Sequence, residues 1–202
     1  MEDDDHFSRL TRSPRQWQDH ARGLVWAANR LRRIIERRVR LGFGRRGLSE
    51  TEALHQRHHS SRAVILLYSF AVENMLKAIW LARGYDPIGP GGSLKREFAH
   101  HKLVKLASSA KVAGLNSTVL LQVTDFIESG RFPAGKDAAR GLAAQRYFGD
   151  SVVRSLEELL TQLEAELAAT GHSELAKATK LTLLGLRPRR SISKIARRRT
   201  RG

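Results

Sequence analysis

Residues 63–82 read AVILLYSFAVENMLKAIWLA, and this stretch decides the fold class of the chain. Apolar side chains recur there at helical spacing, and the segment is apolar nearly all round. A soluble chain places such a helix at the centre of a bundle, where other helices cover every face. The sequence therefore predicts an all-α protein built around this helix.

Signals on either side define the other predicted helices. Ser49 and Glu52 form a capping box that starts the central helix, and Gly84 stops it. Four further segments combine caps, stops and apolar periods: 13–42, 100–112, 116–130 and 150–171. In the first of these the apolar stripe runs from Trp17 to Ile35. We expect an up-and-down helical bundle of about five helices with a basic C-terminal tail.

Length and composition predict a single domain with two appendages. The 202 residues suffice for one ordinary core, which we place at 13–171. Residues 1–12 are expected to be an acidic, disordered N-terminus, and 172–202 a basic tail that is partly disordered. The chain has no Cys, and its longest apolar run, 63–72 with Ser69 inside it, is too short to cross a bilayer. We therefore expect a cytoplasmic protein without membrane contact.

Positive charge is concentrated in the two flanks of the chain. The formal net charge is +16, and residues 9–46 hold 12 Arg against two acidic residues. Such clusters attract RNA or another polyanion through counterion release, although a solvated basic surface has the same pattern. The expected nucleic-acid contacts are Arg33, Arg37, Arg40, Arg189, Arg190, Arg197, Arg198, Arg199 and Arg201.

Three short runs stand out in the middle of the chain. Tyr68–Ala78 is an apolar run with an acidic residue and a Leu-Lys-Ala step, and it is followed by His100-His101-Lys102-Leu103 and by Gly130-Arg131-Phe132-Pro133. These landmarks resemble the central helix, the start of the next helix and the Gly-Arg-Tyr-Pro corner of the HEPN superfamily of prokaryotic domains. The landmarks cover residues 63–135. The resemblance implies RNA or nucleotide binding in a toxin–antitoxin or phage-defence setting, with a homodimer as one expected assembly.

Many members of this superfamily are metal-independent endoribonucleases with an Arg-x(4–6)-His motif, and others are non-catalytic scaffolds. Two formal matches occur here, Arg15–His20 and Arg96–His101, but 27 Arg and 8 His produce that many by chance. The motif therefore leaves cleavage undecided. The alternatives are a non-catalytic interaction module with a cognate protein partner and a nonspecific nucleic-acid binder that uses the Arg-rich flanks.

Charged residues inside the apolar central helix predict a polar cluster within the bundle. Glu73 and Lys77 are four residues apart, and buried charges require partners. His and Arg could act as acid, base and phosphate clamp in metal-free RNA cleavage, or they could cap helix ends. The expected cluster comprises Glu73, Asn74, Lys77, His100, His101 and Arg131. No metal or cofactor is expected, and the three Trp residues are expected in the core.

Overall fold

The computed structural model describes residues 2–40, 50–130 and 150–171, and the part of the chain it describes is all-α. The only extended pairing in these ranges is an isolated antiparallel bridge between Ile88 and Leu94. The helices, in chain order, are α1 (Glu2–Thr11), α2 (Pro14–Arg40), α3 (Glu50–Ala82), the short 3-10 turn η2 (Pro90–Gly92), α4 (Arg96–Ala99), α5 (Leu103–Ser109), α6 (Ser117–Gly130) and α8 (Asp150–Ala169).

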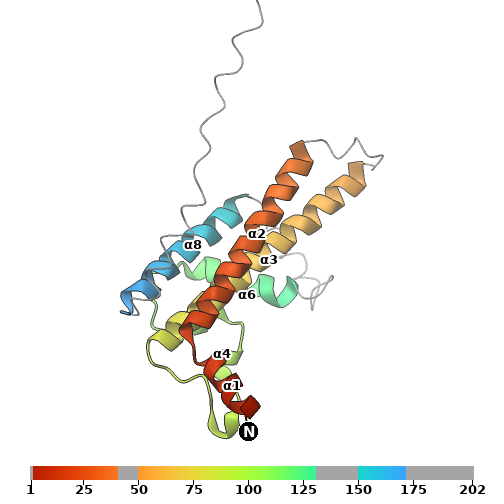
Figure 1. The fold of residues 1–202 in the computed structure, drawn as a ribbon. Coiled ribbons are helices and arrows are strands. Elements are labelled where there is room, and N and C mark those ends of the chain that lie inside the picture. The colour runs from red at the N-terminus through yellow and green to blue at the C-terminus, as the bar shows by residue number, and fades with distance from the viewer. Residues whose placement is uncertain (1, 41–49, 131–149, 172–202) are drawn as a thin grey trace, which may run out of the picture.

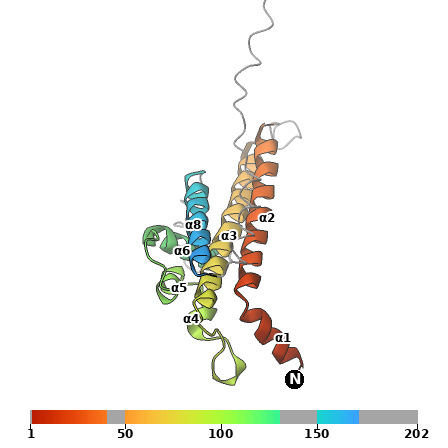
Figure 2. The same ribbon diagram turned by 60° about the vertical axis from the view of Figure 1, so that its left-hand side comes forward.

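Helices α2 and α3 form a long antiparallel pair that organises the fold (Figures 1 and 2). Their register is fixed at two places: Tyr68 contacts Asn29, and Lys77 lies over Trp17. Small residues allow the two helices to approach closely, since Ala21 and Ala28 on α2 are fully buried. The predicted apolar stripe of α2 therefore forms this interface.

Helix α8 packs along α3, and α5 and α6 also pack against α3 (Figure 2). Two ion pairs, Arg22–Glu164 and Arg32–Glu157, join α8 to α2. The predicted apolar face of α8 is buried, with Leu156, Leu163 and Leu167 fully inaccessible. Arg83 ties the end of α3 to Glu166 of α8 at 2.9 Å and also donates to the backbone carbonyl of Ala110. The predicted helical bundle is thus confirmed.

Two segments differ from the sequence prediction. Residues 2–11, expected to be disordered, form helix α1, and Arg12 just beyond it makes a bidentate ion pair with Asp86 at 3.0 and 3.1 Å. The helix expected to begin at His100 begins at Leu103, because the preceding residues form α4 and an extended connection. The expected basic tail, 172–202, lies outside the described residues.

The central helix is long and apolar enough to be compared with a membrane span. Ser61–Ala82, which is longer than the apolar run 63–72, has a mean hydropathy of 1.5 over its most apolar window. In the bundle, 78% of that window is buried. Its apolar character is therefore that of a core helix enclosed by α2, α5, α6 and α8.

Candidate functional site

A buried charged cluster lies where α3 meets the connection before α5. Glu73 is only 3% exposed, and its two carboxylate oxygens have different partners. Oε1 accepts from Lys77 Nζ at 2.7 Å, and Oε2 lies 2.8 Å from Nδ1 of His101. A carboxylate with both oxygens engaged tolerates burial, because each interaction replaces hydration that folding removes. The predicted polar cluster forms for these three residues.

Aromatic rings complete the surroundings of Lys77. Its Nζ lies 5.0 Å from the centroid of Trp17 and 5.3 Å from that of Phe98, which meet edge to face. Ring faces attract cations, and the attraction strengthens where water is excluded. Trp80 packs against Phe98 at 5.3 Å and extends this aromatic layer. The ammonium is therefore held by one carboxylate and two rings.

Of the other predicted residues, the two that the structure describes, His100 and Asn74, do not join this cluster. Nδ1 of His100 accepts from the backbone N–H of Lys102 at 3.2 Å, a local turn that precedes α5. Burial and the nearby cations Lys105, Lys77 and Lys102 lower the pKa of His100. Asn74 is half-buried, and among the described side chains it bonds to none of the three cluster residues. Arg131 lies outside the described residues.

A second feature is an exposed stripe on α2 made of Trp26, Arg30, Arg33 and Arg37, which we call the Trp–Arg stripe. Spacings of four, three and four residues place these side chains on one face of the helix. All are exposed, and Trp26 is 67% exposed, so its expected place in the core was wrong. Within the described side chains, no carboxylate lies within 4.0 Å of the three guanidinium groups.

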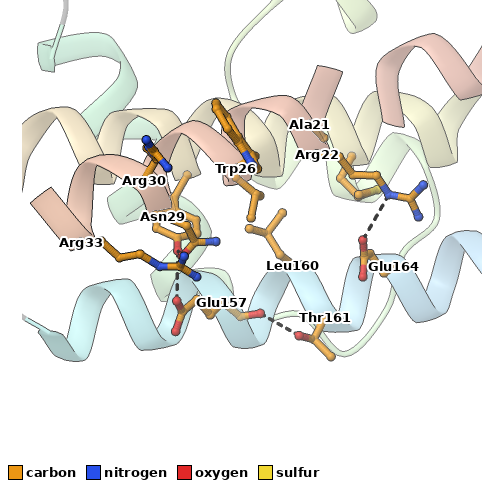
Figure 3. Close-up of a pocket in the computed structure, with 13 residues that line it drawn as sticks. Ala21, Arg22, Trp26, Asn29, Arg30, Arg33, Glu157, Leu160, Thr161 and Glu164 are labelled. Carbon is orange, nitrogen blue, oxygen red and sulfur yellow. Dashed lines mark hydrogen bonds and ion pairs between the residues drawn. The ribbon is translucent and has the colours of Figure 1, made fainter. Parts of the chain in front are cut away.

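A pocket of about 420 Å³ opens beside the Trp–Arg stripe, between α2 and α8 (Figure 3). Its volume falls within the roughly 300–1,000 Å³ usual for small-ligand sites. Trp26 and Arg30 line it from α2, while Glu157 and Glu164 point toward it from α8. The floor is apolar and includes Met75 and Leu160, Ala21 and Val25. The pocket therefore combines an apolar floor, a basic rim and an acidic wall.

A hydrogen-bond network fixes one end of this pocket. Oε1 of Glu157 accepts from Arg32 at 2.8 Å and lies 3.0 Å from the Tyr68 hydroxyl, which is also 2.9 Å from Oδ1 of Asn29. The phenol has one proton, so it donates to one oxygen at a time. Burial, followed by the charge of Glu157, raises the pKa of Tyr68. The network joins α2, α3 and α8 at a single point.

The other end of the pocket holds a weaker pair. Oε1 of Glu164 lies 3.7 Å from Nε of Arg22, longer than an N–H···O hydrogen bond, and both side chains are about 15% exposed. Burial raises the pKa of Glu164, while the charge of Arg22 partly opposes that shift. Glu164 is therefore a partly buried carboxylate, and additional hydrogen-bond donors would stabilise it.

The other Arg side chains that were expected to contact nucleic acid lie outside the part of the chain that the structure describes. Arg40 ends α2, and the basic tail residues Arg189, Arg190, Arg197, Arg198, Arg199 and Arg201 fall in 172–202. Within residues 2–40, 50–130 and 150–171, no three His, Asp or Glu side chains are grouped so as to hold a metal ion.

Comparison of this chain with protein families, curated proteins and solved structures found no match. Function must therefore be inferred from the two features above.

Several residues of these features were not predicted. Trp17 and Phe98 surround Lys77 through contacts that no local pattern encodes. Glu157 and Glu164 are polar positions of an amphipathic helix, and the sequence pattern does not distinguish them from its other polar positions. The exposure of Trp26 did have a signal, since it lies two residues from both Leu24 and Ala28 and hence about 200° around the helix from each.

Proposed function

We propose that this protein binds single-stranded RNA along the Trp–Arg stripe of α2. The observation that supports the proposal is an indole, 67% exposed, in line with three exposed Arg residues. Proteins that bind single strands without strict sequence preference combine aromatic platforms for the bases with cations for the phosphates. The stripe supplies both groups on one helix face.

The charge and exposure of the Trp–Arg stripe favour a binding surface over a basic surface that contacts only water. An exposed Trp costs hydration free energy, which binding of a base would recover. Arg30, Arg33 and Arg37 have no carboxylate within 4.0 Å among the described side chains, whereas Arg15 and Arg32 on the same helix pair with Asp19 and Glu36. Their charge is therefore available to phosphate. The resemblance in residues 63–135 favours RNA over DNA.

The experiment is a titration of a fluorescein-labelled twelve-nucleotide uridine RNA with the full chain, followed by anisotropy at several salt concentrations. Replacing Arg30, Arg33 and Arg37 with Gln removes three phosphate contacts. The slope of log affinity against log salt should then become shallower by about 2, because each contact on a single strand contributes roughly 0.7.

A control variant has the same net charge as the variant that lacks Arg30, Arg33 and Arg37. Arg96→Gln, Lys105→Gln and Lys111→Gln remove three exposed cations that lie on neither α2 nor α8. This control should retain most of its affinity if the stripe is the site. Equal losses in the two triple variants would show that affinity follows net charge, and no loss in either would place binding in the basic tail; both results contradict the proposal.

A second activity, RNA cleavage without a metal, is favoured by the Glu73–His101 pair. A carboxylate at Nδ1 fixes the orientation of the His101 ring, as general acid–base catalysis requires. Trp17 beside this cluster and Trp26 lie on opposite faces of α2, so binding and cleavage would occupy separate surfaces.

Cleavage has its own test. The labelled RNA should be shortened by the wild type and not by His101→Ala, while His100→Ala should remain active because His100 is engaged in a local turn. Binding without cleavage in every variant would support the alternative of a non-catalytic module.

A further inference from the structure

The pocket beside the Trp–Arg stripe has a polarity that can select among bases. Trp26 stands at its α2 rim, and the apolar floor behind it includes Val25 and Leu160. A flat ring that stacks on the exposed indole lies at the rim of this pocket. Recognition of single-stranded RNA commonly works in this way, with an aromatic side chain on the face and polar groups on the Watson–Crick edge.

The polar groups on the α8 wall are hydrogen-bond acceptors. Ionised carboxylates cannot donate, so Glu157 and Glu164 match a base edge that presents N–H groups. The two are not equivalent. Oε1 of Glu157 already accepts a hydrogen bond from Arg32 and lies 3.0 Å from the Tyr68 hydroxyl. The ion pair of Glu164 with Arg22 is longer, at 3.7 Å. Glu164 therefore has more to gain from a new donor pair.

The Arg side chains that would contact the phosphates lie on the other side of Trp26 along α2. Arg30 and Arg33 follow Trp26 by one and two turns, while Arg22 and its partner Glu164 precede it by one turn. Along the pocket, Trp26 lies between Arg30 on one side and the Arg22–Glu164 pair on the other (Figure 3). A phosphate at Arg30 therefore leaves the side of Trp26 that faces Glu164 for the base edge. The order of groups along α2 sets this direction.

We propose that the pocket selects guanine, with the base stacked on Trp26 and its N1–H and N2–H groups donated to the two oxygens of Glu164. Among the four bases of RNA, only guanine presents two adjacent donors on this edge, which matches a carboxylate. Adenine and cytosine present one amino group, and uracil one imino group between two carbonyls. This inference rests on the proposed RNA binding and adds base selectivity to it.

The first measurement compares twelve-nucleotide uridine RNA with the same strand carrying a single central guanosine, both titrated with the full chain. The guanosine strand should bind roughly ten-fold more tightly, as expected for one two-donor base contact. GMP should compete with the labelled strand at lower concentration than AMP, CMP or UMP. Equal affinity for the two strands overturns base selection while leaving binding on the stripe intact.

Two variants locate the selectivity. Glu164→Gln replaces one acceptor oxygen with a donor amide and should remove the preference for guanosine, while binding of the uridine strand changes little. Thr161→Trp places a bulky side chain at the exposed pocket rim and should have the same effect, whereas Gln162→Trp on the adjacent exposed position should not. A preference that persists in both Glu164→Gln and Thr161→Trp overturns the inference. Loss of all RNA binding in the wild type would instead contradict the proposed function.

Discussion

Oε2 of Glu73 lies 2.8 Å from Nδ1 of His101, so a buried carboxylate on α3 anchors the connection that leads into α5. The same carboxylate compensates Lys77, and both charged side chains are at most 7% exposed. The bundle therefore carries a pair of opposite charges inside its core, where removal of one partner leaves the other without compensation.

Glu73→Ala should destabilise the fold by about 3–5 kcal/mol, the usual cost of leaving one charge of a buried pair uncompensated. Urea unfolding followed by far-UV circular dichroism measures this change. Glu158→Ala, which removes an exposed carboxylate from α8, is the control and should change stability by less than about 0.5 kcal/mol.

Glu73→Gln combined with Lys77→Met should cost less than the sum of the two single changes, because the double variant buries no unpaired charge. The four proteins form a double-mutant cycle, and the coupling free energy is read from their unfolding curves. Strict additivity would show that the 2.7 Å contact between these side chains contributes no coupling in solution.

Trp26→Ala should mainly weaken RNA binding, whereas Trp80→Ala should mainly lower the stability of the fold. Trp26 is 67% exposed, so its removal should change stability by less than about 0.5 kcal/mol and weaken RNA binding by about 1–3 kcal/mol. Trp80 is 6% exposed and packs on Phe98, so its removal should cost about 3–5 kcal/mol of stability. Thermal unfolding and RNA titration of both variants separate the two roles, and a large loss of stability in Trp26→Ala would contradict its exposure.

His100→Asn should make the protein less sensitive to acid. Burial, with Lys105, Lys77 and Lys102 nearby, lowers the pKa of His100 in the folded state, so the unfolded chain takes up the proton first. The stability that neutral His100 contributes is present above pH 6.5, the ordinary value, and is lost as pH falls through the lower folded-state pKa. Asn retains an acceptor for the Lys102 N–H and does not titrate. The loss of unfolding free energy between pH 7 and pH 5 should therefore be smaller in the variant, and an identical loss would contradict the prediction.

Asn116→Ala should destabilise α6 by about 1 kcal/mol. Its Oδ1 accepts from the backbone N–H groups of Thr118 at 3.0 Å and Val119 at 3.2 Å, which no helical carbonyl satisfies. Thr118→Ala, at the exposed position two residues later, is the matched control. Chemical denaturation of both variants tests whether the cap, rather than helix propensity, accounts for the difference.

The sequence predicted what depends on neighbours along the chain. Ser13-Pro14 and Asn116 mark the starts of α2 and α6 because caps act over two or three residues. Glu73 and Lys77 were paired correctly because four residues make one helical turn.

What depends on packing across the fold was not predictable in the same way. The sequence predicts the His pair and Arg131 as partners of Glu73. The path of the chain before α5, which the sequence does not specify, brings His101 into this contact. Glu164 faces Arg22 because α8 packs antiparallel to α2, which no local pattern specifies. The acidic composition of residues 1–12 predicts disorder, whereas residues 2–11 form helix α1. The apolar residues Phe7 and Leu10 lie on this helix.

The burial of α3 has a consequence for synthesis of the chain. The ribosome completes the apolar segment Ser61–Ala82 well before it makes α8, whose Leu156, Leu163 and Leu167 fill the bundle core. Until α8 emerges, the nascent chain presents an apolar helix whose covering is incomplete, and such surfaces bind chaperones or aggregate. Helix α2 is already synthesised by then, so early pairing of α2 with α3 would shield one side of this helix during translation.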